Sequence, residues 1–314
     1  MSAYSPGLLQ PRLPLAETAD LTTREFIQFR DLIHEETGIF LGDSKRMLLH
    51  GRLLRRVREL GLPCFGDYYE LVKRPGEHAE FVRMMDLVTT NETQFFREPH
   101  HFDYLEQKAL PEWVAAAAAG ERDKRLRVWS AGCSSGEEPY SIAMVLLSHF
   151  PRQQGWSVDI LASDLSTRVL ETARSATWPI EKAARIPERF LKRFMLKGVD
   201  AREGELRAGR EIRDVIRFER INLADDPRPE GGPFDIILCR NVLIYFSAER
   251  RAEVADNMIS QLKPVGLFLV GHAESLRSDG RLVCVYPTIY RTPSLRSKES
   301  LRPVESDERK WRRP

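Results

Sequence analysis

Residues 127–146 read RVWSAGCSSGEEPYSIAMVL, the stretch from which the fold is most readily predicted. The pattern indicates a buried strand over Leu126–Ser130, a tight loop of small residues over Ala131–Glu138, and a helix that begins near Pro139. Proline is favourable at the first helical position, because its missing N–H group would be unpaired there in any case. Such a unit opens a nucleotide-type α/β sheet, whose ligands bind beyond the carboxyl ends of the strands.

The charges of this loop indicate the class of ligand. A phosphate-binding loop carries positive charge and a Gly-Lys-Ser/Thr or Gly-x-Gly-x-x-Gly pattern. Here the loop ends with Glu137 and Glu138, and residues 131–141 contain no Lys or Arg. Two carboxylates would repel a pyrophosphate but suit an ammonium or sulfonium group, such as that of S-adenosylmethionine. The alternative is that both glutamates only stabilise the positive end of the helix dipole.

Composition bounds the remaining possibilities. The chain has 314 residues, 42% hydrophobic residues and a formal net charge of +2, which is ordinary for one large or two smaller globular domains. Neither a membrane-spanning apolar run nor a signal-peptide pattern is found, so we expect a cytoplasmic protein without membrane insertion. The cysteines show no metal-ligand spacing and are expected to be reduced; they are Cys64, Cys133, Cys239 and Cys284.

The N-terminal part predicts a small helical module. Residues 1–19 lack apolar periodicity and are expected to form a disordered arm, whereas residues 20–88 predict several short helices. Thr22-x-x-Glu25 is a capping box that opens the first helix. A second helix is expected over 44–60, with an inward face that comprises Met47, Leu53, Leu54, Val57 and Leu60.

The opposite face of this second helix is basic. It comprises Lys45, Arg52, Arg55 and Arg56. Solvation alone explains most faces of this kind, and docking of an acidic partner is the alternative. Only the flanking Glu59 is placed to neutralise one of these arginines at helical spacing.

Residues 89–119 predict a linker followed by a helix from Phe102 to Ala119. The linker, TTNETQFFREPHHF, begins with six hydrogen-bonding side chains, which is unusual for a plain connection. Its adjacent residues His100 and His101 could suggest a metal, but adjacent histidines rarely share one ion, so we expect none.

The remaining segments complete the predicted sheet. A second strand over Val158–Asp164 ends in an acid, which in doubly wound sheets binds the ribose hydroxyls. Further strands are expected over Ile216–Leu223 and Phe234–Asn241, and the latter is apolar enough to be central. Residues 179–197 are expected to be basic and mostly helical, 198–213 to form an excursion outside the sheet, and 294–314 to form a disordered tail.

With these elements placed, the sequence resembles the chemotaxis receptor methyltransferases, the CheR-type protein-glutamate O-methyltransferases. The resemblance covers roughly residues 20–291 and is carried by the ordered motifs TTNETQFFRE, VWSAGCSSGEEPYS, ASDLSTRVLETAR, INL, FDIILCRNVLIYF and KPVGLFLVGHAESL. It implies an α/β fold: an all-α N-terminal domain, then a Rossmann-like S-adenosylmethionine-dependent methyltransferase domain over 120–293 with a small inserted β-subdomain at about 198–213. It also implies methylation of glutamates on chemoreceptor cytoplasmic helices, with S-adenosylhomocysteine as product.

Site residues follow from the same resemblance, position by position. It implies cofactor contacts from Asn91, Thr93, Arg97, Glu138, Asp164, Asn222, Leu223, Arg240 and Asn241. Arg97 and Tyr245 would lie nearest the transferred methyl group and are the expected catalytic residues. The basic helix matches a receptor-docking helix through Lys45, Arg52, Arg55 and Arg58, with Arg56 on the same face.

Two other functions stay open at this point. A nucleic-acid methyltransferase would carry an Asn/Asp-Pro-Pro-Tyr turn after the fourth strand, where this chain has Arg240-Asn-Val-Leu-Ile-Tyr245. The small net charge also argues against a nucleic-acid partner. A non-enzymatic signalling adaptor that binds the cofactor is the second alternative. A monomer is the default expectation.

Overall fold

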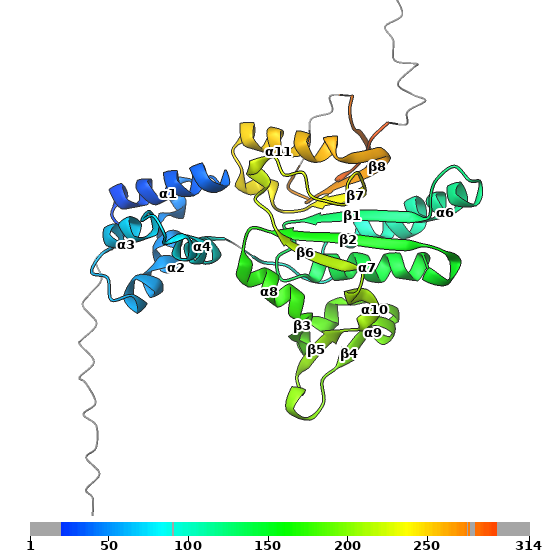
Figure 1. Cartoon of the computed structure of the whole chain (residues 1–314), viewed down its shortest axis with the longest axis horizontal. Coiled ribbons are helices and arrows are strands. Elements are labelled where there is room, and N and C mark those ends of the chain that lie inside the picture. The colour runs from blue at the N-terminus through cyan, green and yellow to red at the C-terminus, as the bar shows by residue number, and fades with distance from the viewer. Residues whose placement is uncertain (1–19, 90, 275, 277–279, 294–314) are drawn as a thin grey trace, which may run out of the picture. The chain divides into compact units, whose positions relative to one another are not determined.

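The computed structural model describes residues 20–89, 91–274, 276 and 280–293 (Figure 1). The arm predicted over 1–19 and the tail predicted over 294–314 lie outside the described residues. The chain divides into two compact units between residues 90 and 91. The segment predicted as a linker therefore belongs, from Asn91 onward, to the second unit.

The first unit consists of helices α1 (Thr23–Thr37), α2 (Arg46–Glu59), α3 (Phe65–Val72) and α4 (His78–Val88), with a short turn η1 (Asp43–Lys45) before α2. The predicted capping box is confirmed, because Thr22 and Glu25 each bind the other's backbone N–H. Gly38 ends α1 with φ of 71°, a left-handed conformation that favours glycine. The core of this unit includes Phe26, Phe29, Leu53, Val57 and Tyr68.

The inward face of α2 differs from the prediction, which included Met47 and omitted Leu49; Leu54 and Leu60 are only partly buried. Leu49, Leu53 and Val57 are buried at i, i+4 spacing, whereas Met47 is 68% exposed. Met47 precedes Leu49 by two residues, so it lies about 200° around the helix from that buried line. The assignment of Met47 to the inward face was therefore wrong.

The basic face of α2 also needs a correction. Arg56 was expected on that face, but its Nη2 lies 2.6 Å from Glu80 Oε2 on α4, and Tyr68 donates to Glu80 Oε1 at 2.9 Å. The hydrogen bond to Glu80 raises the pKa of Arg56. Arg52 donates to the carbonyl of Val88. Both arginines therefore bind groups inside the helical unit, and the sequence of α2 alone could not reveal these partners.

The second unit is built on a seven-stranded sheet of order β6-β2-β1-β7-β8-β10-β9 (Figure 1). The first five of these strands are parallel, and β10 is antiparallel to both β8 and β9. Their bounds are β1 (Arg125–Ala131), β2 (Ser157–Asp164), β6 (Ile216–Arg220), β7 (Phe234–Cys239), β8 (Leu262–Val270), β9 (Val283–Tyr286) and β10 (Ile289–Arg291). Every residue of β7 is buried, as predicted for a central parallel strand.

Helices cover both faces of this sheet. Helix α7 (Glu137–His149) packs into the core on one face, and α11 (Ala248–Ser260) packs into a second core on the other (Figure 1). Helix α8 (Thr167–Ser175) follows β2. Because β1, β2, β6 and β7 run parallel to one another, their carboxyl ends meet at one shared edge of the sheet.

The helix expected from Phe102 begins earlier and is interrupted. It consists of α5 (Pro99–Tyr104), a π-helical turn η2 (Leu105–Ala109) and α6 (Leu110–Ala118). Pro111 has no N–H group for a bond to the carbonyl four residues earlier, and the π turn lies directly before it.

The inserted subdomain is larger than predicted. Strands β3 (Thr177–Pro179), β4 (Met195–Lys197) and β5 (Glu205–Ala208) form a separate antiparallel sheet of order β3-β5-β4. The turn η4 (Ile180–Arg185) and helix α9 (Glu188–Phe194) lie between its strands, and α10 (Arg210–Arg213) follows. The inserted subdomain begins at Thr177 rather than near residue 198. The sequence did not reveal β3 and β4, because strands of three residues are too short to show a period of two.

Among the described residues, none of the helices combines the length and apolar character needed to cross a membrane.

We expect Arg56→Met to lower the free energy of unfolding by about 2 kcal/mol, because Glu80 would keep its packed position without its cation. Urea denaturation followed by circular dichroism measures this change. Arg58→Met, an exposed position on the same helix, is the matched control and should cost less than about 0.5 kcal/mol. Equal losses in the two variants would contradict an internal role for Arg56.

Candidate active site

The loop after β1 is held tightly against its neighbours. The backbone N–H groups of Gly132 and Cys133 both donate to the carbonyl of Ser163 at 2.8 Å. Gly132 has φ of 80°, and a Cβ atom there would lie 2.3 Å from Cγ2 of Val242. Only glycine allows this approach, so the loop after β1 and the turn after β7 pack directly together.

The two glutamates of the loop have different environments. Helix α7 begins at Glu137 rather than near Pro139, and the Glu137 side chain is fully buried in an ion pair with Lys182. Glu137 therefore points into the protein, which corrects the expectation that both carboxylates face a ligand. Glu138 accepts a hydrogen bond from Ser130 Oγ at 2.7 Å and lies 3.5 Å from Arg240 Nη1. Burial raises the pKa of Glu138, and the charge of Arg240 opposes that rise.

Asp164, at the carboxyl end of β2, connects two loops. One carboxylate oxygen accepts the backbone N–H of Ser134 at 2.9 Å, and the other accepts that of Ser166 at the same distance. Its side chain keeps 9% exposure at the edge of the sheet. The structure thus gives Asp164 a role in loop geometry, and its expected contact with ribose hydroxyls stays a prediction.

The motif at 91–98 lies against the loop after β1. Ser134 Oγ donates to the carbonyl of Asn91 at 2.8 Å, and Ser141 Oγ on α7 accepts from the N–H of Phe96 at 3.0 Å. Arg97 Nη1 donates to the carbonyl of Glu92 at 3.1 Å, which folds the motif back on itself. Phe96 and Glu98 both have positive φ, a conformation that costs energy outside glycine. Thr93 is half-buried within this motif.

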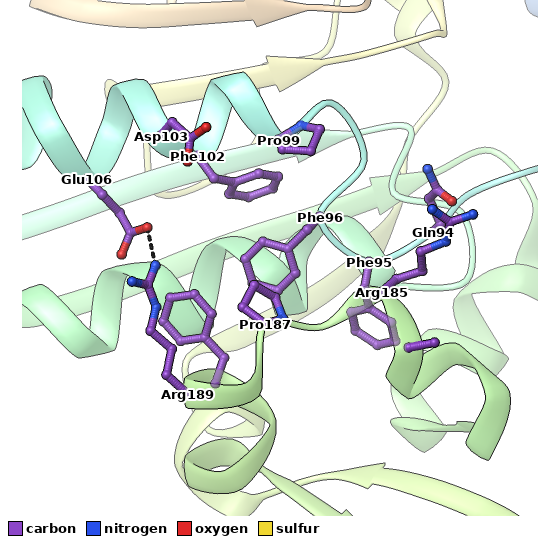
Figure 2. A pocket seen from close by; sticks show the side chains of 12 residues that line it. Gln94, Phe95, Phe96, Pro99, Phe102, Asp103, Glu106, Arg185, Pro187 and Arg189 are labelled. Carbon is purple, nitrogen blue, oxygen red and sulfur yellow. Dashed lines mark hydrogen bonds and ion pairs between the residues drawn. The ribbon is translucent and has the colours of Figure 1, made fainter.

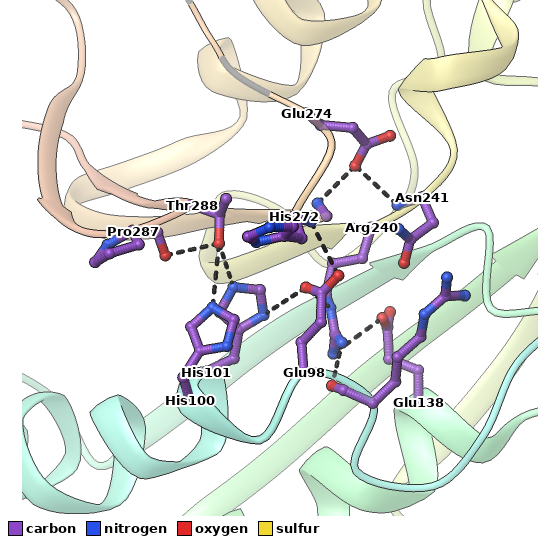
Figure 3. A network of polar contacts seen from close by, with 12 residues as sticks. Glu98, His100, His101, Glu138, Arg240, Asn241, His272, Glu274, Pro287 and Thr288 are labelled. Carbon is purple, nitrogen blue, oxygen red and sulfur yellow. Dashed lines mark hydrogen bonds and ion pairs between the residues drawn. The ribbon is translucent and has the colours of Figure 1, made fainter.

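Arg240, directly after β7, joins these segments. Its side chain is buried, it donates to the carbonyl of Arg97, and it lies 3.6 Å from Glu98 Oε2 and 3.5 Å from Glu138 Oε2 (Figure 3). A buried guanidinium needs such partners, because an unpaired buried charge is strongly unfavourable. The structure therefore brings together three predicted site residues, Arg97, Glu138 and Arg240, from three distant parts of the sequence.

Glu274 is a residue of this site that sequence reasoning missed. One of its oxygens accepts the N–H groups of Asn241 at 2.8 Å and Gly271 at 2.6 Å (Figure 3). The other oxygen accepts the N–H group of Ile244 at 3.1 Å. These bonds hold Asn241 in a left-handed conformation with φ of 60°. The signal was an acid in the motif GHAESL just past a buried strand, but nothing in the sequence indicated that it binds another turn.

Glu98, His100 and His101 form a polar group beside Arg240, and sequence reasoning had considered only the two histidines, as metal ligands. Both histidine Nε2 atoms face Thr288 Oγ1, at 3.3 Å from His100 and 2.8 Å from His101 (Figure 3). Possible metal ligands of these three residues lie within 4.8 Å of one another. The guanidinium of Arg240 already supplies positive charge at Glu98, which opposes binding of a further cation.

The other predicted residues lie on the same edge of the sheet. Asn222 and Leu223 follow β6, where the Asn222 side chain accepts the N–H of Ala224 at 3.2 Å and donates to Asp225 at 2.9 Å. Tyr245 lies on the short turn η7 (Leu243–Tyr245) that follows β7 and is half-buried. Among the described residues, Asn241 Oδ1 is buried without a hydrogen-bond partner, which leaves an acceptor for a ligand.

A separate cavity of about 350 Å³ lies between residues 94–106 and 184–190 (Figure 2). Its walls include Phe96, Phe102 and Phe190, and Arg189 at its rim lies 2.5 Å from Glu106 (Figure 2). None of the predicted site residues lines it. The predicted site therefore depends on the edge of the sheet and not on this cavity.

Comparisons with known proteins agree with this arrangement. Residues 24–89 match the family model described as CheR methyltransferase, all-alpha domain, and residues 91–289 match CheR methyltransferase, SAM binding domain. Chemotaxis protein methyltransferase 2 of Pseudomonas aeruginosa is 39% identical over 271 residues, 86% of this chain and 93% of that protein. Chemotaxis protein methyltransferase of Escherichia coli is 38% identical over 264 residues, 84% and 88% of the two chains.

His101 provides a pH test of this site. Burial, together with the charges of Arg240 and His100, lowers the pKa of His101 to about 2. An unfolded chain binds this proton near pH 6.5, so stability is lost as the pH falls below about 6.5, by up to about 1.4 kcal/mol per pH unit. We therefore expect the free energy of unfolding, measured by urea denaturation at pH 7.5 and 5.5, to fall less between the two pH values in His101→Gln than in the natural protein. Identical slopes in the two proteins would refute the neutral, buried state of His101.

Proposed function

The chain belongs to the CheR methyltransferase family, and from this premise we propose that it methylates glutamate side chains on chemoreceptor cytoplasmic helices. The cofactor is S-adenosylmethionine, and the products are glutamate methyl esters and S-adenosylhomocysteine. The observation that carries the proposal is the meeting of Arg97, Glu138 and Arg240 at the carboxyl edge of the sheet. Acceptors on cytoplasmic helices would place the protein in the cytoplasm.

The residues at this edge fit the cofactor. We assign Asp164 to the ribose hydroxyls, Glu138 to the ammonium group, and Asn222 with Leu223 to the adenine. The remaining contacts would come from Asn91, Thr93, Arg97, Arg240 and Asn241. The buried Asn241 Oδ1 supports this fit, because a ligand donor would satisfy it. When bound, S-adenosylmethionine supplies an electrophilic methyl group on a positively charged sulfur.

The acceptor requires no general base. A glutamate has a reference pKa of about 4.3, so it is already a nucleophilic carboxylate at neutral pH. Catalysis then consists mainly of holding the carboxylate oxygen in line with the methyl group. Arg97 would orient the carboxylate through its charge, and Tyr245 through its hydroxyl. The carbonyl of Arg97 is fixed by Arg240 and its guanidinium by Glu92, so the residue is ordered before a substrate arrives.

The helical unit supplies the proposed docking surface. Lys45, Arg55 and Arg58 are exposed on or just before α2, and they suit acidic receptor helices. Arg55 lies 2.8 Å from Glu59, an exposed pair that a partner can replace at little cost. Arg52 and Arg56 have contacts inside the unit, so we assign them a supporting role on this surface.

The decisive experiment is incubation of the purified protein with S-adenosylmethionine labelled on the methyl group and with receptor cytoplasmic fragments. We expect base-labile label on receptor glutamates, located by mass spectrometry of proteolytic peptides. Cofactor binding without any transfer would support an adaptor instead. Label on another residue type would refute glutamate esterification.

We expect Arg97→Ala to lower kcat/KM by about 100-fold and Tyr245→Phe by about ten-fold, because each loses a contact that aligns the carboxylate. Thermal unfolding midpoints should stay close to that of the natural protein. Tyr104→Phe, which removes a hydroxyl elsewhere in the same unit, is the control for the tyrosine. Normal turnover in either site variant would remove that residue from the mechanism.

Charge reversal tests the docking surface. We expect Arg55→Glu with Arg58→Glu to raise the KM for receptor by about ten-fold, since rim charges act mainly on association. The dissociation constant for S-adenosylhomocysteine, measured by calorimetry, should not change. Arg74→Glu is the control, because it reverses the charge of another exposed arginine of the helical unit, after α3. If the double variant methylates receptor like the Arg74 variant, α2 is only a solvated face.

A further inference from the structure

We propose that the inserted subdomain positions the proposed cofactor-binding loop through Lys182 and Trp178, so that Lys182 is a positioning residue for S-adenosylmethionine. This inference rests on the proposed function, because the loop over 131–138 is the one assigned to the cofactor. It assigns to the insertion a role in the methyltransferase site itself. Three observations on the contacts between the two segments support it.

The first observation is the ion pair between Lys182 and Glu137. Glu137 has an exposed fraction of 0%, whereas the Lys182 side chain on η4 is 35% exposed. Ser135 Oγ donates to the other Glu137 oxygen at 2.7 Å. A fully buried carboxylate is strongly unfavourable unless it is paired, so the conformation at the end of the loop depends on a cation that the insertion supplies.

The second observation is the position of Trp178 on β3. Its indole Nε1 donates to the carbonyl of Ser135 at 3.0 Å, and its ring is buried. The ring packs edge-on against Phe95 at 5.0 Å and Tyr140 at 5.1 Å between ring centroids. Trp178 therefore contacts the loop, the 91–98 motif and helix α7 together.

The third observation concerns the glycines of the loop. Gly132 and Gly136 both have positive φ, at 80° and 96°. Glycines lose more conformational freedom on ordering than other residues, so such a loop needs external contacts to keep one conformation. The contacts from Lys182 and Trp178 reach Ser135 and Glu137, next to Glu138, which is assigned to the cofactor ammonium group. Holding the loop in advance should strengthen cofactor binding by removing the cost of ordering it.

The chain offers a matched pair of lysines for the test. Lys182→Met removes the charge that faces Glu137 and keeps most of the apolar stem. Lys192→Met is the control, because Lys192 lies in the same insertion, is 74% exposed and pairs across the surface of α9 with Glu188 at 2.5 Å. Lys182→Arg restores the charge. The double variant Lys182→Met with Glu137→Gln removes the pair without leaving a buried unpaired carboxylate.

We expect Lys182→Met to raise the dissociation constant of S-adenosylhomocysteine roughly ten-fold by calorimetry, a coupling typical of residues in contact. The KM for S-adenosylmethionine should rise in parallel, while kcat at saturating cofactor changes less than two-fold. Lys182→Arg should recover most of the affinity, and the double variant should bind better than Lys182→Met alone. Lys192→Met should match the natural protein.

Hydrogen exchange provides a readout that a purely structural role would not change. Coupling between two sites is reciprocal. If the insertion holds the loop, then binding of a ligand to the loop should in turn protect the insertion from hydrogen exchange. We expect S-adenosylhomocysteine to slow exchange at residues 177–185 in the natural protein and in Lys192→Met, and much less in Lys182→Met. Should Lys182→Met bind and turn over like Lys192→Met, the positioning role is wrong while the proposed function stands. A natural protein that fails to bind S-adenosylmethionine would overturn both.

Discussion

A buried positive charge at the carboxyl edge of the sheet is the constraint on which the site depends. The Arg240 side chain is only 1% exposed, and its guanidinium lies among the carboxylates of Glu98 and Glu138 and the carbonyl of Arg97. Glu98 and the Arg97 carbonyl belong to the 91–98 motif, Glu138 follows the loop after β1, and Arg240 itself follows β7. Because a buried charge must be paired, the 91–98 motif, the loop after β1 and the turn after β7 are forced to meet at one point.

Close backbone packing makes this meeting possible. Gly132 allows the side chain of Val242 to approach, and a Cβ atom at Gly271 would lie 2.6 Å from Asn241 Nδ2. Glu274 then uses its carboxylate as an acceptor for backbone N–H groups, as a helix cap would, to hold the turn that carries Asn241. The side chains with expected chemical roles therefore depend on neighbours whose role is only to hold the backbone.

Charged residues divide into two groups that look alike in sequence. Glu137 and Glu138 are adjacent, yet the first is neutralised by the insertion and the second faces Arg240. Arg56 and Arg58 lie two residues apart on α2, yet the first is paired with Glu80 and the second is exposed. In both cases the direction of a side chain around a helix decides whether its charge stabilises the fold or is available to a partner.

Local patterns in the sequence determined the strands β1, β2, β6 and β7, the capping box of α1, the central position of β7 and the motifs that carry the family resemblance. These features depend on neighbours within a few residues, so the sequence contains them directly. The ion pair between Glu137 and Lys182, the bonds of Glu274 to Asn241 and Ile244, and the start of the insertion at Thr177 were decided only by tertiary structure. Each joins residues more than twenty positions apart, and no periodic pattern along the chain records which distant groups will become neighbours.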